Sequence, residues 1–229
     1  SPFNKMEIER MRSAIIDEKI SPKSNYFKAY IYFLYHAERL DTLLNGRIHI
    51  PHEKQIKNLS CESNSARDVI NFYRSERGLE LIWEDQIIAS LPIDETKLTP
   101  LTDGQFLWGD PTKYFVGNID GTQSQKPSGF SGYGIYADAL IPVINAHLYR
   151  LSLVVSKKSF TQENILTSLV RGDPIIFYYI LPTQSGKKGE KMPNLHPILW
   201  NTTDGKKIQG YIGQHTGIIV WAKVDDVGK

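Results

Sequence analysis

The sequence predicts an α+β fold, because helical patterns dominate the first half of the chain and strand patterns dominate the second. Apolar residues recur at spacings of three and four through the N-terminal half. Short β-branched and apolar runs, separated by turn residues, fill much of the C-terminal half. With 229 residues, of which 41% are hydrophobic, the chain is long enough for one large domain or two small ones.

Two helices are predicted before the main domain. A short helix covers residues 5–18, and a stronger one runs from about residue 24 to residue 45, where Gly46 is a natural C-terminal cap. We expect residues 1–46 to form a helical extension laid on the main domain or on a partner. The main domain then comprises residues 47–229.

The main domain is expected to begin with a short strand at residues 47–51. Helices should follow at residues 61–77 and 84–91. Residues 92–134 form the least regular stretch, since their density of Gly, Pro, Asp and Asn specifies turns. The aromatic residues of this long loop favour an ordered wall or lid beside a cleft. They are Phe106, Trp108, Tyr114, Phe115, Phe130 and Tyr133.

The C-terminal part of the main domain is expected to mix helices with strands. Residues 136–147 suit a helix, and so do residues 161–171, which Thr161 caps and Gly172 stops. The nearly unbroken apolar run at residues 174–181 suits a strand in the centre of a sheet. The remaining strand candidates cover residues 148–155, 198–201, 207–212 and 216–225.

The overall charge and the cysteine count exclude several partners and sites. A net charge of +2 argues against nucleic acid, and Gly and Glu interrupt the lysines at Lys187, Lys188 and Lys191. A single cysteine excludes an internal disulfide and a cysteine-based zinc site. No apolar run approaches the length that spans a bilayer. Because the chain begins at Ser1 rather than Met, removal of an N-terminal signal or anchor would agree with a place at the cell surface.

The single cysteine, Cys61, is the first candidate for chemistry. Ser60 can cap a helix that begins at Cys61, where the positive end of the helix dipole favours a thiolate. Polar neighbours at Ser63 and Asn64 argue against the alternative of a small buried hydrophobic residue. A carboxylate at Glu62 disfavours a thiolate, so this side chain is expected to point away from the sulfur.

Two further residues suggest a nucleophile with an imidazole base. Gln55 lies six positions before the cysteine, and its neutral amide could stabilise an oxyanion. His215 precedes an apolar strand, and from spacing alone a catalytic base and a turn histidine are equally supported. A third group that orients the imidazole stays open. Asp225 and Asp226 are the nearest downstream carboxylates, but on a straight strand they lie roughly 30 Å from His215.

A His-x-x-His pair, His49 and His52, offers two possible metal ligands. No carboxylate-rich or thiolate-rich segment supports it. We therefore expect neither a metal nor another cofactor.

Residues 48–222 resemble the C39-like cysteine peptidases of bacteria, a branch of the papain-like fold. The resemblance is carried by an ordered set of short motifs. They are Ile48-His-Ile-Pro51 with Gln55, Leu59-Ser-Cys-Glu-Ser-Asn-Ser-Ala66, Ser90-Leu-Pro92, Gly109-Asp-Pro111 with Tyr114-Phe-Val-Gly117, Gly132-Tyr-Gly-Ile-Tyr136, Gly172-Asp-Pro-Ile-Ile176 and His215-Thr-Gly-Ile-Ile-Val220.

The resemblance implies a papain-like domain with the nucleophile on a helix and the base on an antiparallel sheet. Residue by residue, it implies Cys61 as nucleophile, His215 as base and Gln55 as oxyanion donor. Members of the branch are often exported and attached to the cell surface, which implies an extracytoplasmic protein. The bacteriocin-processing members have Cys-Gly where this chain has Cys-Glu, so cleavage after a double-glycine leader is not implied. The family's aspartate beyond the histidine has no clear counterpart.

The sequence therefore predicts thiol-dependent hydrolysis of a peptide or related amide. His215 would take the proton of Cys61, and water would release the acyl-enzyme. The Gly-rich loop with Gly132 and Tyr133, and Trp108 before it, would line the substrate groove. Two alternatives stay open: a catalytically inactive surface module of this fold that binds peptide or glycan, and a transamidase or a peptidoglycan-peptide hydrolase.

Overall fold

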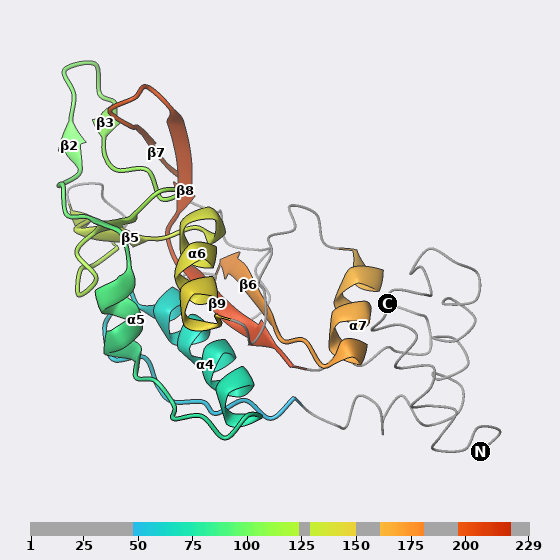
Figure 1. The fold of residues 1–229 in the computed structure, drawn as a ribbon. Coiled ribbons are helices and arrows are strands. Elements are labelled where there is room, and N and C mark those ends of the chain that lie inside the picture. Colours follow the sequence, from blue (N-terminus) through green and yellow to red (C-terminus); the bar gives the residue numbers. More distant parts are fainter. Residues whose placement is uncertain (1–47, 124–128, 150–160, 181–196, 221–229) are drawn as a thin grey trace, which may run out of the picture. The chain divides into compact units, whose positions relative to one another are not determined.

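The computed structural model describes residues 48–123, 129–149, 161–180 and 197–220 (Figure 1). The chain divides into two compact units. The helices expected within residues 1–46, and most of the strand expected at residues 148–155, lie outside the described residues. The larger unit comprises residues 51–156 and 176–217, and the smaller unit comprises residues 1–50, 157–175 and 218–229.

The smaller unit contains helix α7 (Gln162–Arg171), which confirms the helix predicted there. The Thr161 side chain accepts a hydrogen bond from the Asn164 backbone N–H at 3.2 Å, as an N-cap does. Gly172 ends the helix at a φ of 82°, a left-handed conformation that favours glycine.

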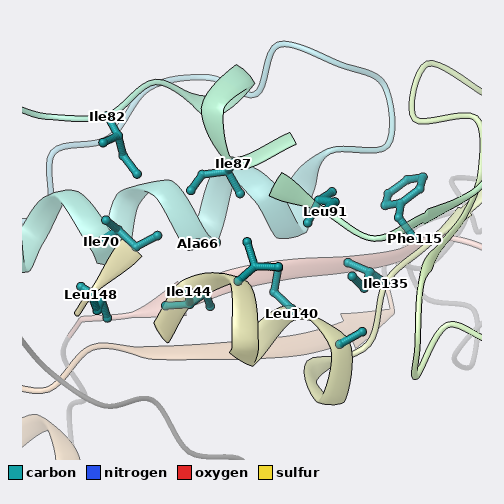
Figure 2. Close-up of a cluster of buried hydrophobic side chains, with 12 residues drawn as sticks. Ala66, Ile70, Ile82, Ile87, Leu91, Phe115, Ile135, Leu140, Ile144 and Leu148 are labelled. Carbon is teal, nitrogen blue, oxygen red and sulfur yellow. The ribbon is translucent and has the colours of Figure 1, made fainter. Parts of the chain in front are cut away.

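The helical part of the larger unit consists of α4 (Cys61–Ser75), α5 (Glu84–Ser90) and α6 (Ala137–His147). All three helices were predicted, and α4 contacts both of the others. Their apolar faces repeat at helical spacing and close over one buried core (Figure 2). This core includes Ala66, Ile70, Ile87, Phe115, Ile135, Leu140, Ile144 and Leu148.

Short strands connect these helices. β1 (Ile93–Asp94) pairs in parallel with β4 (Phe115–Gly117), and β4 pairs antiparallel with β5 (Gly132–Gly134). A second sheet has the order β2-β3-β7-β8. Its strands are β2 (Thr99–Pro100), β3 (Phe106–Leu107), β7 (Pro197–Asn201) and β8 (Lys207–Tyr211). A third pair joins β6 (Ile175–Ile180) to β9 (Gln214–Ile219).

Two expectations about strands are corrected. Residues 48–50 form no strand. The stretch at residues 92–134 contains β1 to β5 rather than turns alone, each only two or three residues long. The strand predicted at residues 174–181 is confirmed as β6, which pairs with β9. Its expected place in the centre of a sheet stays a prediction.

A second core lies against the four-stranded sheet and is built from aromatic rings. The ring centroid of Trp200 lies 5.6 Å from that of Trp108 and 5.0 Å from that of Tyr133. The backbone passes close to these rings, since a Cβ atom at Gly210 would lie 2.7 Å from the Tyr133 ring. Most of the aromatic residues expected beside a cleft therefore fill a core, as Trp108, Phe115, Phe130 and Tyr133 do.

Two ion pairs lie at the turn between β7 and β8. Lys206 Nζ lies 3.1 Å from Asp110 Oδ2, and Lys113 Nζ lies 2.7 Å from Asp204 Oδ2. Asp110 also accepts a hydrogen bond from the Thr112 backbone N–H at 2.9 Å, as a turn aspartate does. Within the described ranges, no helix is long and apolar enough to cross a membrane.

Candidate functional site

Cys61 begins α4, and only 8% of it is exposed. Ser60 does not cap the helix as expected. Its hydroxyl instead accepts a hydrogen bond from the Lys57 backbone N–H and donates one to the Lys57 carbonyl, both at 3.1 Å. The helix therefore starts at the predicted residue, but the Ser60 hydroxyl is hydrogen-bonded within the preceding turn and does not cap the helix.

Glu62 faces the sulfur, which is the opposite of the orientation expected from its charge. The Cys61 thiol donates a hydrogen bond to Glu62 Oε2 at 3.1 Å. The other oxygen, Oε1, accepts from the Ile135 backbone N–H at 3.4 Å. Glu62 is 3% exposed, and it fits because Gly134 has no side chain: a Cβ atom there would lie 2.5 Å from Oε1.

This environment keeps the thiol protonated. Burial first, and then the neighbouring Glu62 carboxylate, raise the pKa of Cys61 far above its usual range. Hydrogen bonds from the Thr216 hydroxyl and backbone lower the same pKa by less. Burial raises the pKa of Glu62 to about 7. The expectation that the helix dipole would favour a thiolate is therefore wrong in this environment.

The strand expected to carry the base does reach Cys61, but with a different residue. Thr216 is 4% exposed, and its hydroxyl lies 3.1 Å from the Ser65 hydroxyl on α4. Neighbouring residues of a strand point to opposite faces, so His215 and Thr216 lie on different faces of β9. Its ring meets Tyr179 edge to face, with centroids 5.4 Å apart. Burial lowers the pKa of His215.

Contacts on both faces of β9 agree with the placement of His215 and Thr216 on different faces. A Cβ atom at Gly217 would meet the rings of Phe177 and Tyr179 at 3.0 and 3.3 Å, on the side that His215 occupies. On the side of Thr216, the Tyr178 hydroxyl donates to the Ile135 carbonyl at 3.1 Å. The contact expected between Cys61 and His215 therefore stays a prediction, while the two elements that carry these residues meet through Ser65 and Thr216.

Gln55 is placed in the turn before α4. Its Nε2 donates to the Lys57 carbonyl at 2.8 Å and to the Asn58 carbonyl at 3.1 Å. Both amide N–H groups are thus used to close this turn. Gln55 could donate to an oxyanion beside Cys61 only after these hydrogen bonds to Lys57 and Asn58 are broken.

The residues predicted to line a substrate groove are packed in the aromatic core. Trp108 and Tyr133 are each 2% exposed, and the Trp108 Nε1–H donates to the Thr96 carbonyl at 2.8 Å. Gly132 is also buried, and a Cβ atom there would lie 2.1 Å from the Asn118 carbonyl oxygen. Asp225 and Asp226 lie outside the described residues.

A groove of about 640 Å³ lies over β7 and β8, beside the turn that precedes β3. It was not predicted, and the sequence of β8, Lys-Ile-Gln-Gly-Tyr, alternates polar with apolar or small residues, which was a signal that one face of this strand is covered. Among the described residues that line it, Lys207 is the charged one. Its lining is Gly104, Gln105, Phe106, Phe130, Pro197, Ile198, Leu199, Trp200, Asn201, Lys207, Ile208 and Ile212.

The back of α4 carries a buried ionic cluster that was not predicted either. Arg67 Nε donates to Asp68 Oδ1 at 2.9 Å, and Arg67 Nη1 lies 3.8 Å from Glu84 Oε2. Asp68 also holds His52, at 2.6 Å from Oδ2 to Nδ1. The adjacent Arg-Asp pair on a helix expected to be buried was its only signal. Among the described residues, no three His, Cys, Asp or Glu side chains gather as metal ligands would.

Comparisons with known proteins give a limited result. No family model matches the chain, and no curated protein matches it. A crystal structure from Bacillus anthracis named a "putative C39-like peptidase" is similar over 77% of this chain and 76% of that chain, with 18% sequence identity and a TM-score of 0.49. A likeness of this size carries no argument about activity. The larger unit mixes helices with β-sheets and contains a buried thiol.

Proposed function

We propose that the larger unit is a non-catalytic binding module for peptides, and that Cys61 is a buried structural thiol. One observation carries this proposal: the thiol donates its hydrogen bond to the Glu62 carboxylate at 3.1 Å. A cysteine nucleophile reacts as the thiolate, and a base or a cation beside it promotes that form. A buried carboxylate acts in the opposite direction.

The groove over β7 and β8 is the place for the peptide. Its lining is mainly aliphatic and aromatic, with Phe106, Trp200 and Ile212 among its members. Such a surface suits apolar side chains, whereas a glycan needs hydrogen bonds for many hydroxyl groups. Lys207 at the same groove favours an acidic residue in the peptide.

A second candidate, the thiol-dependent hydrolase, is favoured by one observation. β9 crosses the start of α4 at Cys61, and His215 is next in sequence to the residue in contact. In an active form His215 would replace Thr216 beside the sulfur, and Gln55 would leave its turn to hold the oxyanion. The same thiol chemistry would serve a transamidase with an amine as acceptor.

Alkylation of the thiol separates the two candidates. Because Cys61 is the single cysteine of the chain, iodoacetamide labelling followed by mass spectrometry reports on it directly. A structural thiol reacts slowly at neutral pH, and its rate rises only above about pH 9. Rapid labelling near neutral pH that is lost in His215→Ala would support the hydrolase and contradict the binding module.

A peptide library tests the binding function itself. The protein is immobilised, incubated with random peptides, and the bound and cleaved fractions are sequenced. We expect capture of peptides rich in apolar and acidic residues, unchanged in Cys61→Ala. Cleavage that disappears in Cys61→Ala would instead assign the hydrolase, and the absence of both capture and cleavage would count against both candidates.

A further inference from the structure

Glu62 stands where three elements meet. It belongs to α4, its Oε1 lies against Gly134 of β5 and accepts from Ile135, and its Oε2 accepts from Cys61. Ser65, one turn further along α4, has its hydroxyl 3.1 Å from the Thr216 hydroxyl of β9. One carboxyl group therefore links α4 to β5, close to the point where α4 meets β9.

The groups that face this carboxyl are all weak acids. They are the Cys61 thiol and the phenols of Tyr133, Tyr136 and Tyr178, from α4, β5, the start of α6 and β6. No cation approaches Glu62 within the part of the chain that the structure describes. Asp68, by contrast, is buried against Arg67. Among the described residues, α4 thus has a buried counter-charge for Asp68 and none for Glu62.

A negative charge on Glu62 is therefore uncompensated. Two hydrogen bonds, one of them from a thiol and one long, replace the solvation that water would give. A neutral carboxyl costs much less to bury, and it can donate as well as accept among hydroxyl and thiol groups.

We infer that Glu62 is a proton-controlled clamp, which holds α4 and β5 together while it is neutral and loosens this junction when it ionises. The clamp acts whether or not the groove binds peptides. Tyr133 lies next to Gly134 and packs on Trp200, so loosening of β5 also reaches the floor of the groove.

The direction of the pH effect follows from the two states of the chain. Burial raises the pKa of Glu62 to about 7 from an ordinary value of 4.5, so the folded state binds this proton more tightly than the unfolded state. The extra stability is complete below about pH 4.5 and is lost as the pH rises through about 7. The equilibrium constant for unfolding should rise about a hundredfold across this window because of Glu62 alone.

Urea unfolding of the whole chain between about pH 5 and about pH 8.5 tests the clamp. Glu62→Gln imitates the neutral acid, so its unfolding constant should lack the roughly hundredfold increase with pH that Glu62 causes in the wild type. Glu95→Gln, a change at an exposed carboxylate, is the matched control and should retain the wild-type slope. Equal slopes for the wild type and Glu62→Gln would overturn the inference.

A measurement on the wild type keeps the test independent of whether the variant folds. Carbon-13 labelling of glutamate carboxyl groups allows each to be titrated by NMR. We expect one glutamate to titrate near pH 7, while hydrogen exchange at the Ile135 amide accelerates over the same range. Titration of every glutamate below about pH 5.5, or exchange at Ile135 that follows only the intrinsic pH dependence, would refute the clamp.

Discussion

Gly134 controls how closely β5 approaches the Glu62 carboxyl. Its φ is +141°, and a Cβ atom would lie 2.5 Å from Glu62 Oε1. Gly134→Ala should therefore lower the free energy of unfolding by about 2–4 kcal/mol, from backbone strain and the displaced carboxyl together. Urea denaturation gives the value.

Gly205→Ala separates the cost of backbone strain from the cost of displacing the Glu62 carboxyl. Gly205 has a φ of +81°, and a Cβ atom added there would have no neighbour within 4 Å, so the change measures backbone strain alone, about 1 kcal/mol. Adding Glu62→Ala to Gly134→Ala removes the steric contact and should make Gly134→Ala less costly. Equal effects of Gly134→Ala and Gly205→Ala would show that the carboxyl is not enclosed as described.

Substitutions at Thr216 and His215, neighbouring positions of β9, test which of the two side chains affects the Cys61 thiol. Thr216→Val removes the hydroxyl that lowers the pKa of Cys61, so iodoacetamide labelling should slow further at every pH. His215→Ala should leave the labelling rate unchanged, because its ring lies with Tyr179. A rate that falls several-fold in His215→Ala and not in Thr216→Val would place the imidazole at the sulfur instead.

At the scale of a single helix, Arg67 forms buried ion pairs that stabilise α4. Arg67→Met leaves Asp68 and Glu84 buried without their cation, and we expect a loss of about 3–5 kcal/mol in the free energy of unfolding. Lys113→Met removes an exposed partner of Asp204 and should leave the free energy of unfolding almost unchanged. Similar costs for the two variants would mean that the buried cluster is not a structural anchor.

A substitution in the groove over β7 and β8 that leaves the buried core intact tests whether peptides bind there. Ile212 is half-buried and lines the groove, so Ile212→Asp should reduce peptide capture at least tenfold with a small change in stability. Leu79→Asp, at an exposed position outside the groove, is the matched control and should leave capture unchanged. Capture that survives Ile212→Asp would place the peptide elsewhere.

Across the whole molecule, the near balance of charge predicts no nucleic-acid partner. A net charge of +2 supplies little of the attraction to phosphates on which nonspecific binding depends. A fluorescein-labelled oligonucleotide should show no saturable change in anisotropy at about 0.15 M salt. Saturable binding under these conditions would contradict this prediction.

The elements that could be predicted are those long enough to show a period. The helices α4, α6 and α7 repeat apolar residues over several turns, and β8 alternates over five residues. β1 to β5 were missed because two or three residues cannot display a period. Their positions are set by pairing across the fold.

The site could be located from the sequence, but its chemistry could not. The start of α4 and the strand near residue 215 do meet, as helix and strand patterns predicted. Which side chain reaches the sulfur depends on a shift of one residue along β9, and such a shift exchanges the two faces of a strand. The orientation of Glu62 depends on Ile135, 73 positions away, which no local pattern reveals.

The parallel pairing of β3 with β7 has a consequence for biosynthesis. Leu107 meets Asn201 across this pair, so a nascent chain that stops before β7 lacks the partner of β3 and the second wall around Trp108. Contacts this distant in sequence form late and leave apolar surface open in the meantime. A fragment ending at residue 196 should therefore be found with chaperones or in inclusion bodies, whereas the full chain stays in the supernatant.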